Sequence, residues 1–160
     1  MPARIFSVDY YYTTVANQPG QGCAFLKALA AGEVNLLAFN AFPVSPEHTQ
    51  LVIYPQNSTW LGELARRQGL HLQGPHHAFL VQGDDELGAL LSIHQKLCDA
   101  DINVTSSTGL TDGRGRYRYI LHVEPEAYDR SLEVLGVDQG LQRWVDFELK
   151  HHRRFSKAQA

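Results

Sequence analysis

The chain has 160 residues, of which 44% are apolar and 19% are charged, and its net charge is −3 with histidine neutral. This composition predicts one ordinary globular domain or two small ones, and it excludes general disorder. A slightly acidic chain has no overall attraction for nucleic acid or anionic membranes, and no apolar run approaches the roughly 20 residues of a membrane helix. Because the N-terminus also lacks the layout of a signal peptide, we expect a cytoplasmic protein without membrane contact.

The first half of the chain alternates between strand-like and helix-like composition. β-branched and aromatic residues dominate the segment 5–15, which favours a strand. After the sequence NQPGQG (17–22), apolar residues recur at helical spacing until Gly32. Ser58 or Thr59 can cap a second helix. We expect strands at 5–15, 34–42, 49–54 and 70–73, and helices at 23–32 and 60–68.

The second half repeats this order of elements. The Gly-rich sequence TDGRGR (111–116) predicts a hairpin loop, and Pro125 suits the first turn of a helix. An apolar residue, Val137, then stands at the place of a short last strand. The other expected elements are strands at 76–83, 102–110 and 117–123, and helices within 84–100 and 124–136.

An offset of 68 residues relates the two halves. The pairs at this offset are Asn17 and Asp85, Gly20 and Gly88, Leu29 and Leu97, Val34 and Ile102, and Asn35 and Asn103. A shared offset from the first turn to the second strand predicts a tandem duplication, with its junction near 73–76. We expect the offset to be lost after the second strand, because the hairpin loop of the second half reads as longer.

The predicted fold class is α+β, with two tandem ferredoxin-like βαββαβ modules. In each module, two helices would pack on one face of a four-stranded antiparallel sheet. The predicted domains are 5–74 and 76–137, followed by a C-terminal helical extension and basic tail at 138–160. About 70 residues make a marginal core, so the two halves should pack together.

Two stretches carry a family resemblance. They are VANQPGQGCAFLKALAAGEVNLLAF, with Pro19-Gly20 and Val34-Asn35, and FLVQGDDELGALLSIHQKLCDADINV, with its acidic turn and DADINV. Over residues 5–137 the chain thereby resembles the ACT domain family, whose members are small regulatory modules that bind amino acids. Asn17 replaces the family's usual acidic residue and Leu87 its usual Pro. The two halves are therefore not expected to be chemically equal.

The resemblance implies that an amino acid binds between the first turn of one module and the second strand of its neighbour. The first socket would contain Asn17, Gln18, Gly20, Gln21, Gly22, Val34 and Asn35. The second would contain Asp84, Asp85, Gly88, Ile102 and Asn103. Backbone N–H groups reached through Gly suit a carboxylate, and Asn or Asp oxygens suit an ammonium. In the alternative, the glycines only turn the chain and the asparagines only tie down loops.

Other sites are not expected. NQPGQG (17–22) lacks the Lys and the Ser or Thr that a phosphate loop requires, and no pattern for a metal or a catalytic nucleophile occurs. Cys23 and Cys98 are interpreted as buried small hydrophobes, and His94 as a partly buried helix residue. We expect no cofactor, no metal and no enzymatic activity.

The expected function is that of a sensor or regulatory protein. Binding of an amino acid across two modules would shift their arrangement, and a regulated enzyme partner would respond to that shift. The chain is expected to form a homo-oligomer, a dimer, and not to bind nucleic acid. The alternatives are a protein–protein adaptor that keeps the ACT fold without a ligand, and a ferredoxin-like enzyme with an unrecognised site.

Overall fold

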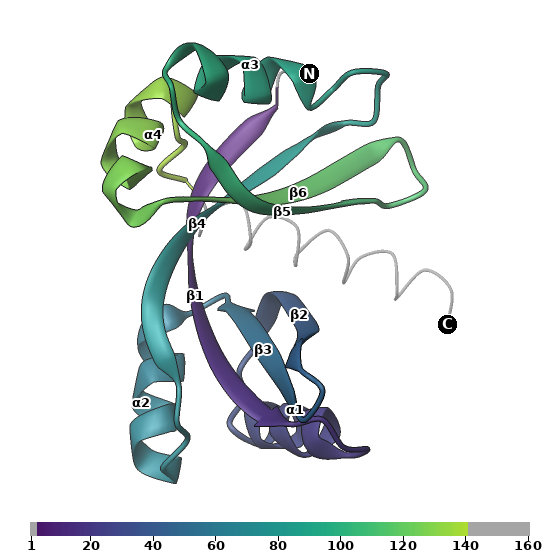
Figure 1. The fold of residues 1–160 in the computed structure, drawn as a ribbon, viewed down its shortest axis with the longest axis vertical. Coiled ribbons are helices and arrows are strands. Elements are labelled where there is room, and N and C mark those ends of the chain that lie inside the picture. Colours follow the sequence, from purple (N-terminus) through teal and green to yellow (C-terminus); the bar gives the residue numbers. More distant parts are fainter. Residues whose placement is uncertain (1–2, 141–160) are drawn as a thin grey trace, which may run out of the picture. The chain divides into compact units, whose positions relative to one another are not determined.

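The computed structural model describes residues 3–140, and these fall into two compact units (Figure 1). The N-terminal unit comprises Asp9–His76. The C-terminal unit combines the residues up to Val8 with those from His77 onward. None of the helices in the described part of the chain is long and apolar enough to cross a membrane.

The N-terminal unit contains the first set of predicted elements, with a strand order of β2-β3-β1-β4. Antiparallel pairing joins β1 to β3 and β3 to β2. The elements are β1 (Arg4–Ala16), α1 (Gln21–Ala31), β2 (Leu36–Ser45), β3 (His48–Pro55), α2 (Ser58–Gln68) and β4 (Gln73–Asp84).

The C-terminal unit has the same architecture, with a strand order of β1-β4-β6-β5. Its further elements are α3 (Leu91–Asp99), β5 (Val104–Thr111), β6 (Arg116–Val123), the 3-10 turn Pro125–Ala127 and α4 (Tyr128–Leu135). The predicted fold class, α+β with two ferredoxin-like modules, is therefore confirmed. The segment 141–160, which holds most of the expected helical extension and the basic tail, lies outside the described residues.

Two strands, β1 and β4, contribute to both units, because the boundaries at 8/9 and 76/77 fall inside them. The strand predicted at 70–73 begins only at Gln73 and continues without a break into the strand predicted at 76–83. The predicted domain junction at 73–76 therefore lies within one continuous strand. The units also differ from the predicted domains at the N-terminus, since the first eight residues group with the C-terminal unit.

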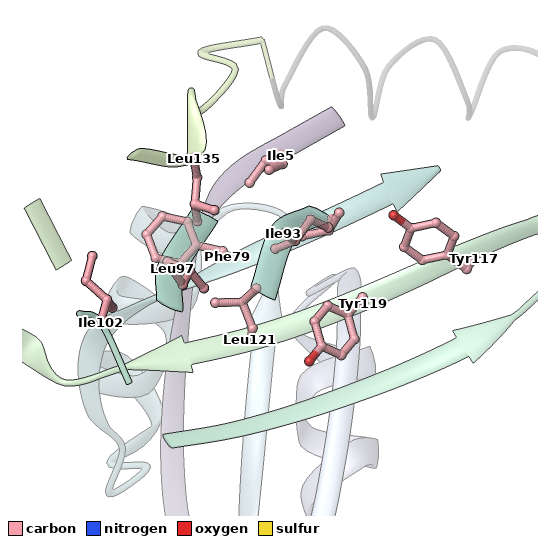
Figure 2. Packing of buried hydrophobic residues seen from close by; sticks show 10 residues of the cluster. Ile5, Phe79, Ile93, Leu97, Ile102, Tyr117, Tyr119, Leu121 and Leu135 are labelled. Carbon is pink, nitrogen blue, oxygen red and sulfur yellow. The ribbon is translucent and has the colours of Figure 1, made fainter. Parts of the chain in front are cut away.

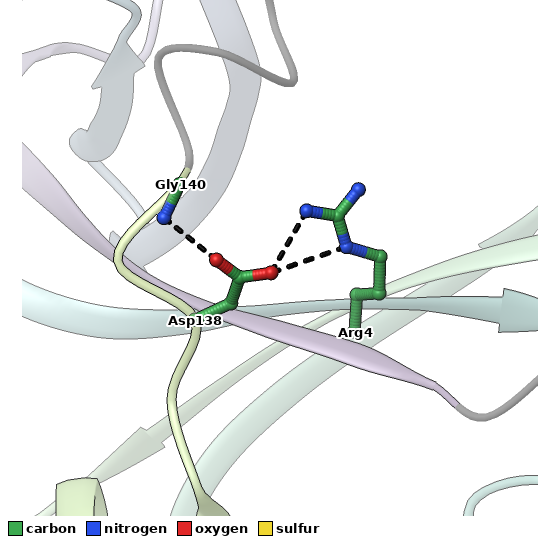
Figure 3. A network of polar contacts seen from close by, with 3 residues as sticks. All are labelled: Arg4, Asp138 and Gly140. Atoms are coloured by element: carbon green, nitrogen blue, oxygen red, sulfur yellow. Dashed lines mark hydrogen bonds and ion pairs between the residues drawn. The ribbon is translucent and has the colours of Figure 1, made fainter.

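The start of β1 occupies the place of the fourth strand in the C-terminal unit. Val137 begins no strand, contrary to the expectation, and Asp138 makes a single parallel bridge to Phe6. The backbone N of Asp138 donates to the carbonyl of Ile5 at 2.6 Å. In Figure 3 the Asp138 carboxylate accepts hydrogen bonds from Arg4, at 2.8 Å from Nη2, and from the Gly140 backbone N. The Arg4 hydrogen bonds hold the pKa of Asp138 below its ordinary value.

The backbone repeats itself at the predicted offset. Hydrogen bonds of 2.9 Å close the end of α1 and of α3, from Val34 N to Leu29 O and from Ile102 N to Leu97 O. In the same turns, two non-glycine residues have positive φ, Glu33 at 57° and Asp101 at 55°. These positions are 68 residues apart, which supports the duplication.

The expected loss of this offset after the second strand is wrong. The pairs Tyr11↔Ile53 and Phe79↔Leu121 keep it, so the third strands of the two units remain in register. The two hairpins contain equal numbers of residues. Their unpaired loops differ in length, because β2 and β3 stay paired up to Ser45↔His48, whereas the β5–β6 ladder ends at Thr111↔Tyr117.

Each unit has its own apolar core on one face of its sheet. In the N-terminal unit the buried members are Tyr11, Leu29, Leu51, Ile53 and Leu61. In the C-terminal unit they are Ile5, Phe79, Val81, Ile93, Leu97, Ile102, Tyr117, Tyr119, Leu121 and Leu135 (Figure 2). Each such side chain contributes roughly 1.5–3 kcal/mol through burial.

Three local predictions have definite outcomes. Cys23 and Cys98 are exposed rather than buried, because the adjacent faces of their helices, with Leu29 and Leu97, point into the cores. The cap of α2 is Asn57, not Ser58 or Thr59, and its Oδ1 accepts from Trp60 N at 2.9 Å. His94 is partly buried as expected.

Candidate functional site

The turn between β1 and α1, together with the first two residues of α1, contains five of the seven residues of the first predicted socket. Gly20 ends this turn in the left-handed region, with φ 90°, and a Cβ added there would meet no atom within 4 Å. Glycine is therefore required by backbone conformation and not by crowding. Gln18 in the turn and Gln21 at the start of α1 are exposed, and Gly22 is half-buried, so this part of the chain presents polar side chains and backbone to solvent.

The Asn17 side chain makes two hydrogen bonds within the N-terminal unit. Its Nδ2 donates to Pro46 O at 3.1 Å, and its Oδ1 accepts from Thr49 Oγ1 at 3.3 Å. The backbone N of Asn17 also donates to Glu47 O at 2.8 Å. Asn17 thereby ties the end of β1 to the hairpin that precedes β3.

Asn35 lies at the other end of β3. Its Nδ2 donates to Gln56 Oε1 at 3.0 Å, and its carbonyl accepts from Gln56 N at 2.9 Å. Val34, half-buried, packs on the core. β3 has eight residues, so roughly 25 Å separates Asn17 from Asn35. A single module cannot place both side chains around one amino acid.

The second predicted socket is divided in the same way. Asp84 ends β4, and the turn that follows carries Asp85 and Gly88, which has a φ of 79°. Asp85 N donates to Gly115 O at 2.8 Å, as its counterpart Asn17 does to Glu47. Asp85 and Gly88 line a hollow of about 430 Å³, which we call the α3 hollow.

Ile102 and Asn103 line a different hollow, of about 720 Å³, beside the exposed strand β5. Ile102 is a buried core residue and Asn103 is exposed. Among the described residues, the side chain of Asn103 has no hydrogen-bond partner, unlike that of Asn35. The structure therefore groups Asp85 with Gly88, and Ile102 with Asn103, but it does not bring these two groups together.

Tyr117 is a residue that the sequence reasoning missed. It lines the α3 hollow from β6, and its hydroxyl oxygen is buried without a hydrogen-bond partner in the part of the chain that the structure describes. Burial raises the pKa of this hydroxyl above its ordinary value. The duplication could have pointed to Tyr117, because Thr49, another residue with a hydroxyl group, stands 68 residues earlier at the matching position.

The described residues contain no cluster of three or more His, Cys, Asp or Glu side chains that could hold a metal ion.

No protein-family model matches the sequence, and no curated protein matches it either. Several solved structures are similar in fold. Protein BT0572 from Bacteroides thetaiotaomicron matches with a TM-score of 0.69 at 12% identity, covering 85% of this chain and 90% of that one. The regulatory subunit of aspartate kinase from Thermus thermophilus, in its ligand-free form, has a TM-score of 0.61 at 11% identity, covering 85% and 96%. The corresponding subunit from Thermus flavus has a TM-score of 0.54 at 10% identity, covering 85% and 95%.

These likenesses span nearly the whole of each matched chain, and at such low identity they concern the fold. They agree with the duplicated βαββαβ architecture and with the resemblance carried by the two turn–helix–strand stretches. The chain therefore has the fold that the resemblance to the ACT domain family implies, two tandem ferredoxin-like modules.

Proposed function

We propose that the protein is a regulatory module that binds an amino acid and transmits the binding as a change in the arrangement of its modules. The socket would combine the first turn of one module with the second strand of a neighbouring module, in the same chain or in a second copy. The amino acid would stabilise one arrangement over others, and a partner enzyme would respond to that shift.

The observation that carries this proposal is the placement of the socket residues. In each unit the polar turn and the strand-start asparagine lie at opposite ends of the sheet, so a complete socket requires two modules. The fold likeness to regulatory subunits of aspartate kinase supports a regulatory role over a catalytic one. That likeness also suggests an enzyme as the regulated partner.

A thermal-shift screen of the full chain against the twenty amino acids at 10 mM tests this proposal. A ligand at 100 times its Kd stabilises the folded state by about 2.7 kcal/mol, which raises Tm by several degrees. We expect one amino acid, or one chemical group of them, to do so. Calorimetric titration then gives the affinity, and sedimentation with and without ligand tests the proposed homodimer.

Substitutions separate the socket from the rest of the surface. Asn35→Ala and Asn103→Ala are expected to weaken binding by about tenfold, since each removes a hydrogen bond to a charged group. Gln95→Ala, on the exposed side of α3, is the control and should bind like the wild type. Unchanged affinity in both asparagine variants would remove these residues from the socket.

One observation favours the alternative of an adaptor without a ligand. The side chains of Asn17 and Asn35 are already engaged inside the N-terminal unit, and a ligand would have to replace those hydrogen bonds. An adaptor of this kind would show no stabilisation by any of the twenty amino acids.

A further inference from the structure

The sheet of the C-terminal unit has two faces, and α3 and α4 pack on one of them. Successive side chains of a strand point to opposite faces of a sheet. The core cluster with the helices contains Ile5 on β1, Phe79 on β4 and Leu121 on β6 (Figure 2). The residues at the alternating positions of these strands therefore point the other way. We call that side the second face, and its members are Phe6, Val8, Ala78, Leu80, Gln82 and Ile120.

The second face is buried, although the buried apolar side chains of α3 and α4 belong to the cluster on the opposite side. None of its members is more than 8% exposed. The matching positions on β1, 68 residues earlier, are more open. Tyr12 stands at the place of Leu80 and is half-buried, and Thr14 stands at the place of Gln82 and is exposed. The β4 side of this face therefore requires a cover that its counterpart on β1 does not.

One polar side chain on the second face indicates what the cover has to supply. Gln82 is 6% exposed, and its Oε1 has no hydrogen-bond partner among residues 3–140. A buried carbonyl oxygen without a partner is costly. The covering element should therefore carry an N–H donor as well as apolar side chains.

The described residues end beside the second face. Asp138 makes its parallel bridge to Phe6, and its backbone N donates to the carbonyl of Ile5 at 2.6 Å. The Asp138 carboxylate in turn accepts from the Gly140 backbone N at 2.7 Å. The segment that follows Gly140 therefore starts next to β1, the first strand in the order β1-β4-β6-β5.

The sequence after Gly140 has the pattern of an amphipathic helix. Leu141, Trp144, Val145 and Leu149 follow one another at helical spacing, which places them on one side. Trp144 adds an indole N–H, a hydrogen-bond donor, to this apolar side. The residues on the opposite side are polar: Gln142, Arg143, Asp146 and Lys150.

The dimensions of such a helix match those of the second face. Residues 141–149 would form a helix about 14 Å long and roughly 10 Å wide with its side chains. The stretch of β4 from Ala78 to Gln82 is about 13 Å long, and β1, β4 and β6 together are about 10 Å wide between the outer strands. One helix of this length is therefore enough to cover the face.

We propose that residues 141–149 form a helix that covers the second face of the same chain, with the Trp144 ring against Val8, Leu80 and Ile120. The C-terminal unit then has helices on both sides of its sheet. This inference does not rest on the proposed amino-acid socket, because none of the socket residues belongs to the second face.

NMR of the full chain tests this contact directly. The methyl groups of Val8, Leu80 and Ile120 report on the second face, and those of Leu97 report on the opposite face. We expect nuclear Overhauser effects from the Trp144 ring to the first three residues and none to Leu97. In a mixture of labelled and unlabelled chains, an isotope-filtered spectrum should lack these effects, because the contact lies within one chain.

The matched variants are Trp144→Asp and Gln142→Asp, which place the same charge on opposite sides of the predicted helix. Trp144→Asp is expected to shift the methyl signals of Val8, Leu80 and Ile120. It should also bind the dye anilinonaphthalene sulfonate, because the apolar second face becomes accessible. Gln142→Asp should do neither. Unchanged methyl signals of the core around α3 show that a variant is folded.

Three outcomes would overturn the proposal: no contact between the Trp144 ring and the second face, contacts that come only from the other chain in the mixed sample, or equal responses of the methyl signals to the two variants. The second outcome would assign the second face to an interface with another copy of the chain. If Trp144→Asp does not fold, the spectra of the wild type still decide between these possibilities.

Discussion

Gly20 is held in the left-handed region by the turn that leads into α1, with φ 90° and open space around its Cα. Gly20→Ala is therefore expected to lower the free energy of unfolding by about 1 kcal/mol or more through backbone strain alone. Gly22→Ala is the control, because Gly22 lies inside α1, has no positive φ and also faces open space. It should raise stability by up to about 1 kcal/mol. Urea denaturation measures both, and equal effects would contradict the conformational argument.

Tyr117 and Tyr119 allow a second comparison at this scale, in the absence of any ligand. Tyr117→Phe removes a buried hydroxyl that has no partner among the described residues, so it should raise the free energy of unfolding by about 1 kcal/mol. Tyr119→Phe removes the hydrogen bond to His94 and should lower it by about 1 kcal/mol. Opposite signs in denaturation experiments are the expected result. A loss of stability in both variants would mean that Tyr117 has a protein partner.

At the scale of the element, the start of β1 is the fourth strand of the C-terminal unit. Ile5 belongs to the core of that unit, 6% exposed, and its carbonyl accepts from Asp138 N. Ile5→Ala is therefore expected to destabilise the C-terminal unit by about 2–4 kcal/mol, as other large-to-small core substitutions do. Amide hydrogen exchange should show reduced protection at Leu121 and Phe79.

Thr14→Ala is the control for that experiment, because Thr14 is exposed on the same strand within the N-terminal unit. It should leave protection at both amides unchanged. If Ile5→Ala also left them unchanged, the first residues of β1 would not complete the C-terminal unit.

At the scale of the whole molecule, stability is expected to fall as the solution becomes acidic. Burial lowers the pKa of His122 on β6 below its ordinary value near 6.5. The unfolded chain then binds a proton at higher pH than the folded one. The stabilisation is complete above about pH 6.5 and is lost as the pH falls through the lowered pKa of the folded state.

Denaturation at pH 7.5 and pH 5.5 measures this dependence. His122→Gln should reduce the difference between the two pH values, whereas His71→Gln, at an exposed position, should not. An undiminished difference in His122→Gln would assign the acid sensitivity to other groups.

Much of the fold was predictable because the duplication doubles each local signal. The same offset separates Gly20 from Gly88 and Leu29 from Leu97. The element pattern in each half therefore supports the pattern in the other, and chance is a poor explanation for it. The elements between them were placed correctly to within a few residues. Errors arose where contacts with distant residues decide whether a side chain is buried. Cys23 is an example: it lies in an apolar helical stretch, but the other side of that helix packs on the core, so Cys23 is exposed.

The candidate site was less predictable. A resemblance suggested which residue types to expect, and both the turn glycines and the asparagines stand at equivalent places in the two units. Whether a side chain is free to meet a ligand depends on partners far along the chain. Asn35 is bound to Gln56, and Asn103 has no such partner within the described residues, although their local sequences are alike.

The duplicated βαββαβ order, the α+β class and the positions of the turns could be predicted from the sequence, because hydrophobic periodicity and glycine conformation are local properties. Two features came from the tertiary structure alone: residues near the N-terminus complete the C-terminal unit, and the Tyr117 hydroxyl is buried without a partner among the described residues. Both depend on which distant strands pair, as Phe6 with Asp138 and Gly83 with Tyr117, and pairing over such separations is set by the packing of the folded chain.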